Sequence, residues 1–368
     1  MKEGWTYKKL GEVCEVISGQ SPEGKYYNTE RKGIPFYQGK KDFSLKYIGE
    51  PTMWTTDVTK IAEKDDLLMS VRAPVGDVNF ATQRLCIGRG LAAIRTKGKV
   101  DKEYLFYFLL AKKNNIKGKE GVGFASINRK EIMDIDIHYP DDLSEQLSIV
   151  ARLDAAFAHI DSLKANAEKQ LAEARQLFQA ELTECMRPKE GWEEKTLPDI
   201  SENLDSIRIP VTKKNRTEGK YPYYGASGIV DYVDDYLFDE DLLCISEDGA
   251  NLLMRTYPIA FPISGKVWVN NHAHVLRFKS MTTQKYIEYY FSGLKLDEYI
   301  TGAAQPKLTQ KALNSIIINI PKTIDIQRSI VSRLDALSAN IKRLEEVQRK
   351  TMAECDALKQ AMLKEIFE

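Results

Sequence analysis

Apolar residues recur at steps of three and four through the segment 144–187, a spacing that keeps them on one side of a helix. They are Leu153, Phe157, Ile160, Leu163, Ala167, Leu171, Ala174, Phe178, Leu182 and Cys185. The segment has no internal glycine or proline and ends before Pro188, which cannot donate a helical hydrogen bond. At about 1.5 Å per residue, such a helix is roughly 65 Å long. Alone it would leave its apolar stripe in water, so the sequence predicts an equally long partner.

The C-terminal segment supplies that partner. The sequence IQRSIVSRLDALSANIKRL from Ile326 repeats EQLSIVARLDAAFAHIDSL from Glu145, 181 positions later. Its apolar stripe consists of Ile330, Leu334, Leu337, Ile341, Leu344, Val347, Thr351, Cys355, Leu358 and Met362. The two helices are predicted to pair as an antiparallel coiled coil. We expect its interface to be formed by Leu153, Phe157, Ile160, Leu171, Phe178, Leu334, Leu337, Ile341, Leu344 and Leu358.

The rest of the chain is also duplicated. KEGWTYKKL at 2–10 returns as KEGWEEKTL at 189–197, and 121–140 aligns with 302–321. Each copy contains short β-branched and aromatic segments, a helix at 102–113 or 283–294, and a short helix at 128–133 or 309–313. The sequence therefore predicts an α+β fold with pseudo-two-fold symmetry. Its parts are a first globular domain at 1–142, a long helix at 143–187, a second globular domain at 188–323 and a second long helix at 324–368.

Composition limits the class of protein. The chain has 53 basic and 53 acidic residues, whereas a free-standing DNA-binding domain is usually basic. Its N-terminus lacks the apolar core of a signal peptide and it has no apolar run of membrane-spanning length, so we expect a cytoplasmic protein without membrane contact. The cysteines are odd in number and never form CxxC, and we interpret all of them as structural.

Catalytic signatures are missing from the sequence. It has no phosphate-binding P-loop, no HExxH and no Asn-Pro-Pro-aromatic motif of adenine methyltransferases. His272 and His274 could share one strand face and bind a metal, but no third ligand cluster is evident nearby in the sequence. Glu247 and Asp248 could act as catalytic carboxylates, but the first copy has Val71 and Arg72 there. A turn or loop contact is the favoured interpretation.

Several loops are basic and rich in Tyr, Gln and Asn, which suits contacts to phosphates and base edges, although an ordinary solvated surface remains an alternative. The basic residues are Lys40, Lys41, Lys112, Lys113, Lys117, Lys119, Arg208, Lys213, Lys214, Arg216 and Lys220. Between the copies the helices match while these loops diverge. That pattern favours a recognition protein with two different heads over an enzyme with two active sites.

These features resemble the specificity subunit of type I restriction-modification systems over the whole chain. The resemblance is carried by YPYYGASGIVDYVDDYLFDEDLLCISEDGANL, KVWVNNHAHVLR, TGAAQPKLTQKALNSIIINIP and IQRSIVSRLD. It implies a non-catalytic subunit whose two target-recognition domains enter the DNA major groove at the two halves of a split target. The paired helices would fix the spacing between halves and dock two methylation subunits.

The resemblance assigns all cofactors to partners. The methylation subunits would use S-adenosylmethionine to methylate adenine at N6, and motor-nuclease restriction subunits would use ATP and Mg²⁺. Two rival interpretations remain: a specificity subunit of a different, type II-like modification system, and a two-headed scaffold that binds protein.

Candidate DNA-binding residues follow from the polar loops. In the first head they are Gln20, Ser21, Lys25, Gln38, Lys40, Arg72, Arg89, Ser126 and Asn128. In the second head Lys213, Lys214 and Arg216 are candidates for phosphate contacts. Candidates near bases or backbone there are Tyr224, Ser227, Asp248, Asn251, Lys266, Asn270, Asn271, Gln305 and Lys307. The Asn271–His272 and Gly249–Asn251 segments could instead be turn scaffolding.

Overall fold

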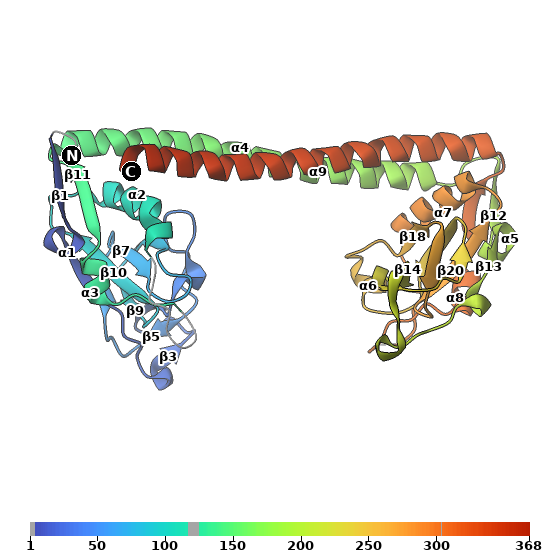
Figure 1. The fold of residues 1–368 in the computed structure, drawn as a ribbon, viewed down its shortest axis with the longest axis horizontal. Coiled ribbons are helices and arrows are strands. Elements are labelled where there is room, and N and C mark those ends of the chain that lie inside the picture. The colour runs from blue at the N-terminus through green and yellow to red at the C-terminus, as the bar shows by residue number, and fades with distance from the viewer. Residues whose placement is uncertain (1–3, 117–124, 303) are drawn as a thin grey trace. The chain divides into compact units, whose positions relative to one another are not determined.

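A computed structural model describes residues 4–116, 125–302 and 304–368 (Figure 1). The chain divides into two compact units. Unit 1 comprises Met1–Ala167 and Arg349–Glu368, and unit 2 comprises Glu168–Gln348. Each unit therefore holds one globular head with the parts of both long helices that pack on it. Among the residues that the structure describes, no helix is both long and apolar enough to cross a bilayer.

The first head, in unit 1, is a mixed α+β globule. Strands form sheets in the orders β1-β11, β2-β10-β7-β8 and β3-β5-β4-β9-β6. Its elements are β1 (Trp5–Lys9), α1 (Leu10–Val13), β2 (Cys14–Ser18), β3 (Tyr27–Asn28), β4 (Ile34–Tyr37), β5 (Trp54–Thr55), β6 (Ile61–Ala62), β7 (Leu67–Ser70), β8 (Val78–Phe80), β9 (Leu85–Ile87), β10 (Leu91–Thr96), α2 (Lys102–Lys112), α3 (Arg129–Met133) and β11 (Asp136–Pro140).

The second head, in unit 2, repeats this plan. Its sheets have the orders β12-β21, β13-β20-β17-β18 and β15-β14-β19-β16. Its elements are β12 (Trp192–Lys195), α5 (Leu197–Ile200), β13 (Ser201–Asn203), β14 (Glu218–Gly225), β15 (Gly228–Val233), β16 (Phe238–Asp239), β17 (Leu242–Ser246), α6 (Asn251–Met254), β18 (Ala260–Ile263), β19 (Lys266–Val269), β20 (Ala273–Phe278), α7 (Met281–Gly293), α8 (Gln310–Asn314) and β21 (Ile318–Pro321).

The long helices are α4 (Leu143–Met186) and α9 (Ile324–Phe367), of 44 residues each. In unit 1, Asp161 pairs with Lys359 and Lys164 with Asp356. In unit 2, the pairs join 175 to 345 and 181 to 333. In both units, the residue number of the α9 partner decreases as that of the α4 partner increases, so the two helices run antiparallel within each unit. The predicted α+β fold with paired long helices is confirmed.

The seam between the helices follows most of the predicted stripe. Leu153, Ile160, Leu171 and Leu334 are buried, and Phe157, Phe178, Leu337, Ile341 and Leu344 are half-buried. The prediction for Leu358 is wrong, because 51% of its surface is exposed. Lys359 and the buried Leu363 follow Cys355 on the covered face instead. The physical reason is that a helix turns once per about 3.6 residues, so a stripe that keeps a strict seven-residue repeat drifts off the covered face.

Each head is attached to the helices by the same contacts. In unit 1 the Tyr107 hydroxyl donates to Asp154 at 2.6 Å, and in unit 2 the Tyr289 hydroxyl donates to Asp335 at 2.6 Å. The side chain of Gln146 donates to the Pro140 carbonyl, as a glutamine of α9 does to Pro321. In both units the core of the head continues onto the long helices. Figure 1 shows α2 and α7 between the sheet of their own head and the helices.

Candidate nucleic-acid interface

The two heads share one backbone frame at the ends of their central strands. Strand β4 pairs in parallel with β9, with Tyr37 opposite Ile87, and β14 pairs in parallel with β19, with Tyr224 opposite Val269. Isolated bridges join Arg72 to Ser126 in the first head and residues 248 and 307 in the second. These registers make equivalent positions of Arg72 and Asp248, Arg89 and Asn271, and Ser126 and Lys307. Different side chains therefore occupy the same places.

In the first head, five predicted residues form one connected group, which we call the first reading surface. The Ser21 hydroxyl donates to Gln38 Oε1 at 2.9 Å, and the Arg89 backbone N–H donates to Ser21 Oγ at 3.2 Å. Arg72 and Ser126 join this group through backbone hydrogen bonds from residue 71 to residue 90 and from residue 90 to Gln38. Gln38, Arg72, Arg89 and Ser126 are exposed, so guanidinium and amide donors can reach a ligand.

The second reading surface comprises Asp248, Asn270, Asn271, His272 and Lys307. His272 Nδ1 lies 2.8 Å from Asp248 Oδ2, and Asn270 Oδ1 accepts the His272 backbone N–H at 2.8 Å. Asn271 and Lys307 are exposed, whereas the side chain of Asn270 is buried and holds the turn. The sequence suggests His272 as a metal ligand or as turn scaffolding; in the structure it pairs with the Asp248 carboxylate, and its backbone N–H takes part in the turn.

The two heads fill one equivalent space in this backbone frame with side chains from different segments. In the first head, a Cβ at Gly88 would come within 2.8 Å of the Gln38 side chain, so glycine leaves room for Gln38. In the second head, Gly225 stands at the position of Gln38, and Asn270 stands at that of Gly88. The side chain that occupies this space thus comes from the residue after β4 in one head and from the turn after β19 in the other. Each head consequently presents a different chemical surface on a common scaffold.

The other predicted residues of the first head lie elsewhere or serve the fold. Asn128 caps α3 by accepting the Glu131 backbone N–H at 3.1 Å. Lys40 pairs with Asp77 at 2.5 Å, and the ion pairs of Asp77 hold its pKa below the ordinary value although burial opposes this. Gln20 and Lys25 are exposed. Two lysines of the predicted basic group, Lys117 and Lys119, lie outside the described residues.

The remaining predicted residues of the second head divide in the same way. Lys213 and Lys214 are exposed on a short 3-10 turn, and Ser227, Lys266 and Gln305 are also exposed. Three others make internal contacts: Arg216 pairs with Asp231 at 2.9 Å, Tyr224 stacks on Phe261, and the Asn251 side chain closes its own loop onto residue 257.

A buried ionic cluster lies directly behind the second reading surface. His274 Nδ1 lies 2.6 Å from Asp205 Oδ2, and Arg208 Nη1 lies 2.7 Å from Glu247 Oε2. Lys307 Nζ is 3.1 Å from Glu247 Oε1. Burial opposes ionisation of Asp205, but its contacts with His274, a backbone N–H and Arg208 hold the pKa of its carboxyl below the ordinary value. Arg208, predicted as part of a basic loop, is therefore turned inward.

This cluster corrects the sequence interpretation, which found no third ligand near the histidines. Ligand atoms of Asp205, Glu247 and His274 lie within 4.8 Å of one another. However, Arg208 and Lys307 already supply the positive charge that the two carboxylates require. A metal ion would have to displace both cations, so these residues do not fit a metal site.

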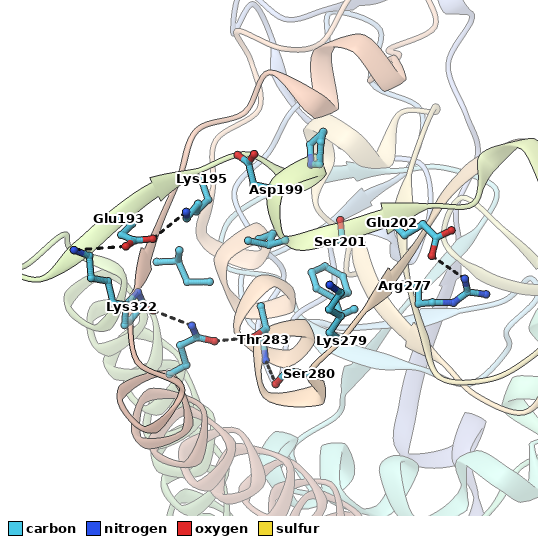
Figure 2. A pocket seen from close by; sticks show the side chains of 16 residues that line it. Glu193, Lys195, Asp199, Ser201, Glu202, Arg277, Lys279, Ser280, Thr283 and Lys322 are labelled. Carbon is cyan, nitrogen blue, oxygen red and sulfur yellow. Dashed lines mark hydrogen bonds and ion pairs between the residues drawn. The ribbon is translucent and has the colours of Figure 1, made fainter.

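A separate cavity of about 530 Å³ lies in unit 2, between β12, β13 and the start of α7 (Figure 2). Its charged side chains largely satisfy one another, since Glu193 pairs with Lys195 and Lys322, and Glu202 pairs with Arg277. Among the described residues that line it, none is a predicted DNA contact. The cavity is therefore distinct from the second reading surface.

The cysteines are all free and buried. Burial raises the pKa of the Cys14 thiol to about 12 and, with a hydrogen bond to Glu181, that of Cys185 to about 11. Both thiols are therefore poor nucleophiles at neutral pH. Their packing agrees with the structural role expected from the sequence.

Comparison with known proteins identifies the class of these duplicated heads. A family model described as the type I restriction modification DNA specificity domain matches residues 2–173 and 189–354. The chain belongs to this family. It is a type I specificity subunit with two recognition domains.

Individual relatives agree with this assignment. A putative type I restriction enzyme specificity subunit of Methanocaldococcus jannaschii is 41% identical over 177 residues, covering 47% of this chain and 41% of the relative. One of Haemophilus influenzae is 35% identical over 145 residues, covering 39% of this chain and 37% of the relative. The matches thus span about two fifths of these two relatives. A second M. jannaschii specificity subunit is 23% identical and covers 88% of this chain and 84% of its own.

Solved structures share the fold. A chain from a study of complex assembly and conformational transition of the type I restriction-modification system has a TM-score of 0.79 at 17% identity, covering 100% of this chain and 98% of the other. The HsdS subunit from Thermoanaerobacter tengcongensis has a TM-score of 0.60 at 18% identity, covering 100% and 97%.

Proposed function

We propose that this subunit reads a two-part sequence of double-stranded DNA, with one head at each half. The observation that carries the proposal is that one backbone frame presents Arg72, Arg89 and Gln38 in the first head but Asp248, Asn271 and Lys307 in the second. Arginine suits the acceptor edge of guanine, asparagine suits adenine, and aspartate accepts from cytosine. Two different donor and acceptor patterns on a repeated scaffold are what a target with two unlike halves requires.

The test is to express the chain with its methylation subunits and to sequence methylated adenines in the host genome. Replacing Arg72 and Arg89 by alanine should relax only one half of the modified sequence, because both side chains belong to the first reading surface. Arg84→Ala is the matched control, since Arg84 is exposed in the same head but lies outside that surface. Exchange of residues 1–142 for those of a relative should also alter one half. Changes in both halves, or in neither, would overturn the proposal.

We further propose that two copies of a methylation subunit dock on the paired helices. Leu177 is 61% exposed and Leu358 is 51% exposed, and they are separated by the same 181 positions that relate the two helices. Leu358 belongs to unit 1 and Leu177 to unit 2. Single exposed apolar residues are common on protein surfaces. What supports a surface covered by a partner is that the same position holds a large exposed apolar residue in both repeats. Two equivalent surfaces indicate two copies of one partner.

The docking proposal predicts a change in stoichiometry. Leu177→Asp or Leu358→Asp should each remove one bound methylation subunit, and the double variant should remove both, as measured by light scattering after size exclusion. Leu147→Asp is the control, because Leu147 is 48% exposed on α4 at a different helical position. An unchanged stoichiometry in the double variant would exclude this surface.

The chemistry belongs to the partners in this proposal. The methylation subunits bind S-adenosylmethionine and methylate adenine, and motor-nuclease subunits with ATP and Mg²⁺ complete a restricting complex in the cytoplasm. The helices α4 and α9 set the spacing between the halves that are read. Adding one helical turn to both helices should then lengthen the spacer of the methylated motif without altering either half.

A further inference from the structure

The buried histidine of the second head has a hydrogen-bond partner at each ring nitrogen. His274 is fully buried, with Nδ1 2.6 Å from Asp205 Oδ2 and Nε2 2.8 Å from the backbone carbonyl oxygen of Leu308. Both partners are acceptors, and an imidazole donates from both nitrogens only when it is doubly protonated. In this geometry both ring nitrogens lie against oxygen atoms, and the Glu247 carboxylate is also only 3.8 Å from Nδ1.

The cluster joins three segments that are distant in sequence. Asp205 opens the 3-10 turn Asp205–Ile207 after β13, and Glu247 follows β17. The third segment contains Lys307 and Leu308, whose backbone N–H donates to the Glu247 carbonyl at 2.8 Å. Two of these segments carry Asp248 and Lys307 of the second reading surface. His274 therefore contacts a residue adjacent in sequence to each of them, Glu247 and Leu308.

The first head folds the same frame without any of these charges. Its strand register places Ala92 at the position of His274, since Ala92 pairs with β7 as His274 pairs with β17. Ser18, Val71 and Ser126 occupy the positions of Asp205, Glu247 and Lys307. The cluster is consequently not a requirement of the fold, and its role must be particular to the second head.

We propose that His274 is a positioning residue for DNA recognition by the second head, holding Asp248 and Lys307 in the arrangement that reads the second half of the target. This inference rests on the proposed function and adds a residue that touches no DNA. Its bridges to Asp205 and Leu308 fix the backbone from which the reading side chains project. Such rigidity supports sequence discrimination, whereas affinity for phosphates depends on the exposed lysines.

The experiment uses the full chain assembled with its methylation subunits. Binding is measured at several salt concentrations to four duplexes: the methylated motif, the motif with its first half scrambled, the motif with its second half scrambled, and a duplex with both halves scrambled. In His274→Gln, we expect discrimination against the scrambled second half to fall about tenfold or more, because a buried residue with hydrogen bonds to both Asp205 and Leu308 is lost. Discrimination at the first half and salt-sensitive binding to fully scrambled DNA should stay unchanged.

The experiment distinguishes a failure of this inference from a failure of the proposed function. Full discrimination at both halves in His274→Gln would overturn the inference. If His274→Gln loses non-specific binding as well, the isosteric variant Asp205→Asn is tested in its place. Retention of second-half discrimination in Asp205→Asn would also overturn the inference. The effects of the two substitutions should be less than additive, because they break the same contact. If the unsubstituted assembly discriminates at neither half, the proposed function fails instead.

Discussion

Truncation of one buried leucine in the helix seam tests the packing that holds unit 2 together. Leu334 on α9 is 0% exposed and packs with Leu182 and Cys185 of α4 and with Tyr289 of α7. Leu334→Ala removes most of a side chain from the junction of three helices. Such substitutions cost about 2–5 kcal/mol, depending on how far the surroundings collapse into the cavity. Three helices held by further contacts collapse little, so we expect about 3 kcal/mol.

The matched control lies on the same helix. Leu358 is 51% exposed, so Leu358→Ala should change the free energy of unfolding by less than about 0.5 kcal/mol. The two variants remove the same atoms and differ only in burial. A difference between them therefore measures the contribution of the seam rather than a change in helix propensity.

Hydrogen exchange followed by mass spectrometry is the appropriate assay, because it resolves stability along the chain. A loss of about 3 kcal/mol corresponds to protection about 150-fold lower, and it should appear in peptides from α7 and from the first half of α9. Peptides of the first head serve as an internal reference. Equal losses of protection in Leu334→Ala and Leu358→Ala, or protection unchanged by Leu334→Ala, would refute the packing argument.

Two further predictions concern charges of the second head. The lowered pKa of Asp205 means that its ionised form stabilises the fold, so Asp205→Asn should cost about 2 kcal/mol at pH 7, as followed by urea unfolding. That difference should persist down to the ordinary pKa of 3.8 and shrink as pH falls through the lowered folded value; a difference that grows on acidification would contradict it. Replacing the exposed Lys213 and Lys214 by alanine should lower the salt slope of DNA binding by about 2, equally for target and scrambled duplexes. A loss confined to the target would show base contacts instead.

The duplication and the long helices could be predicted because their signals are local and periodic. The helix predicted at 143–187 is observed as Leu143–Met186, and those predicted at 102–113 and 283–294 as Lys102–Lys112 and Met281–Gly293. Each of these helix predictions depends on a repeated apolar spacing or on a repeated sequence. Both kinds of signal can be read without knowledge of long-range contacts. Leu358 was misplaced because small differences in helical phase accumulate along 44 residues.

The site could be predicted only in outline. The polarity of the divergent loops predicts Ser21, Gln38, Arg72, Arg89 and Ser126, and the structure connects them. Polarity could not separate such residues from Asn128, which caps a helix. It also could not show that Arg208 faces inward. Arg208 and its partner Glu247 follow β13 and β17, and both of these strands pair with β20. Contacts set by sheet order leave no pattern along the chain.

The two heads therefore differ in how freely their specificity can change. In the first head the equivalents of Asp205 and His274 are Ser18 and Ala92, so substitutions at its reading surface leave no buried charge unpaired. In the second head Lys307 belongs to both the reading surface and the buried cluster, and its loss leaves Glu247 with one cation fewer. Arg208 would remain beside Glu247, but a buried carboxylate that loses part of its compensation costs more than an exposed one. New specificities should thus arise by single substitutions in the first head, whereas the second head requires a compensating change within the cluster.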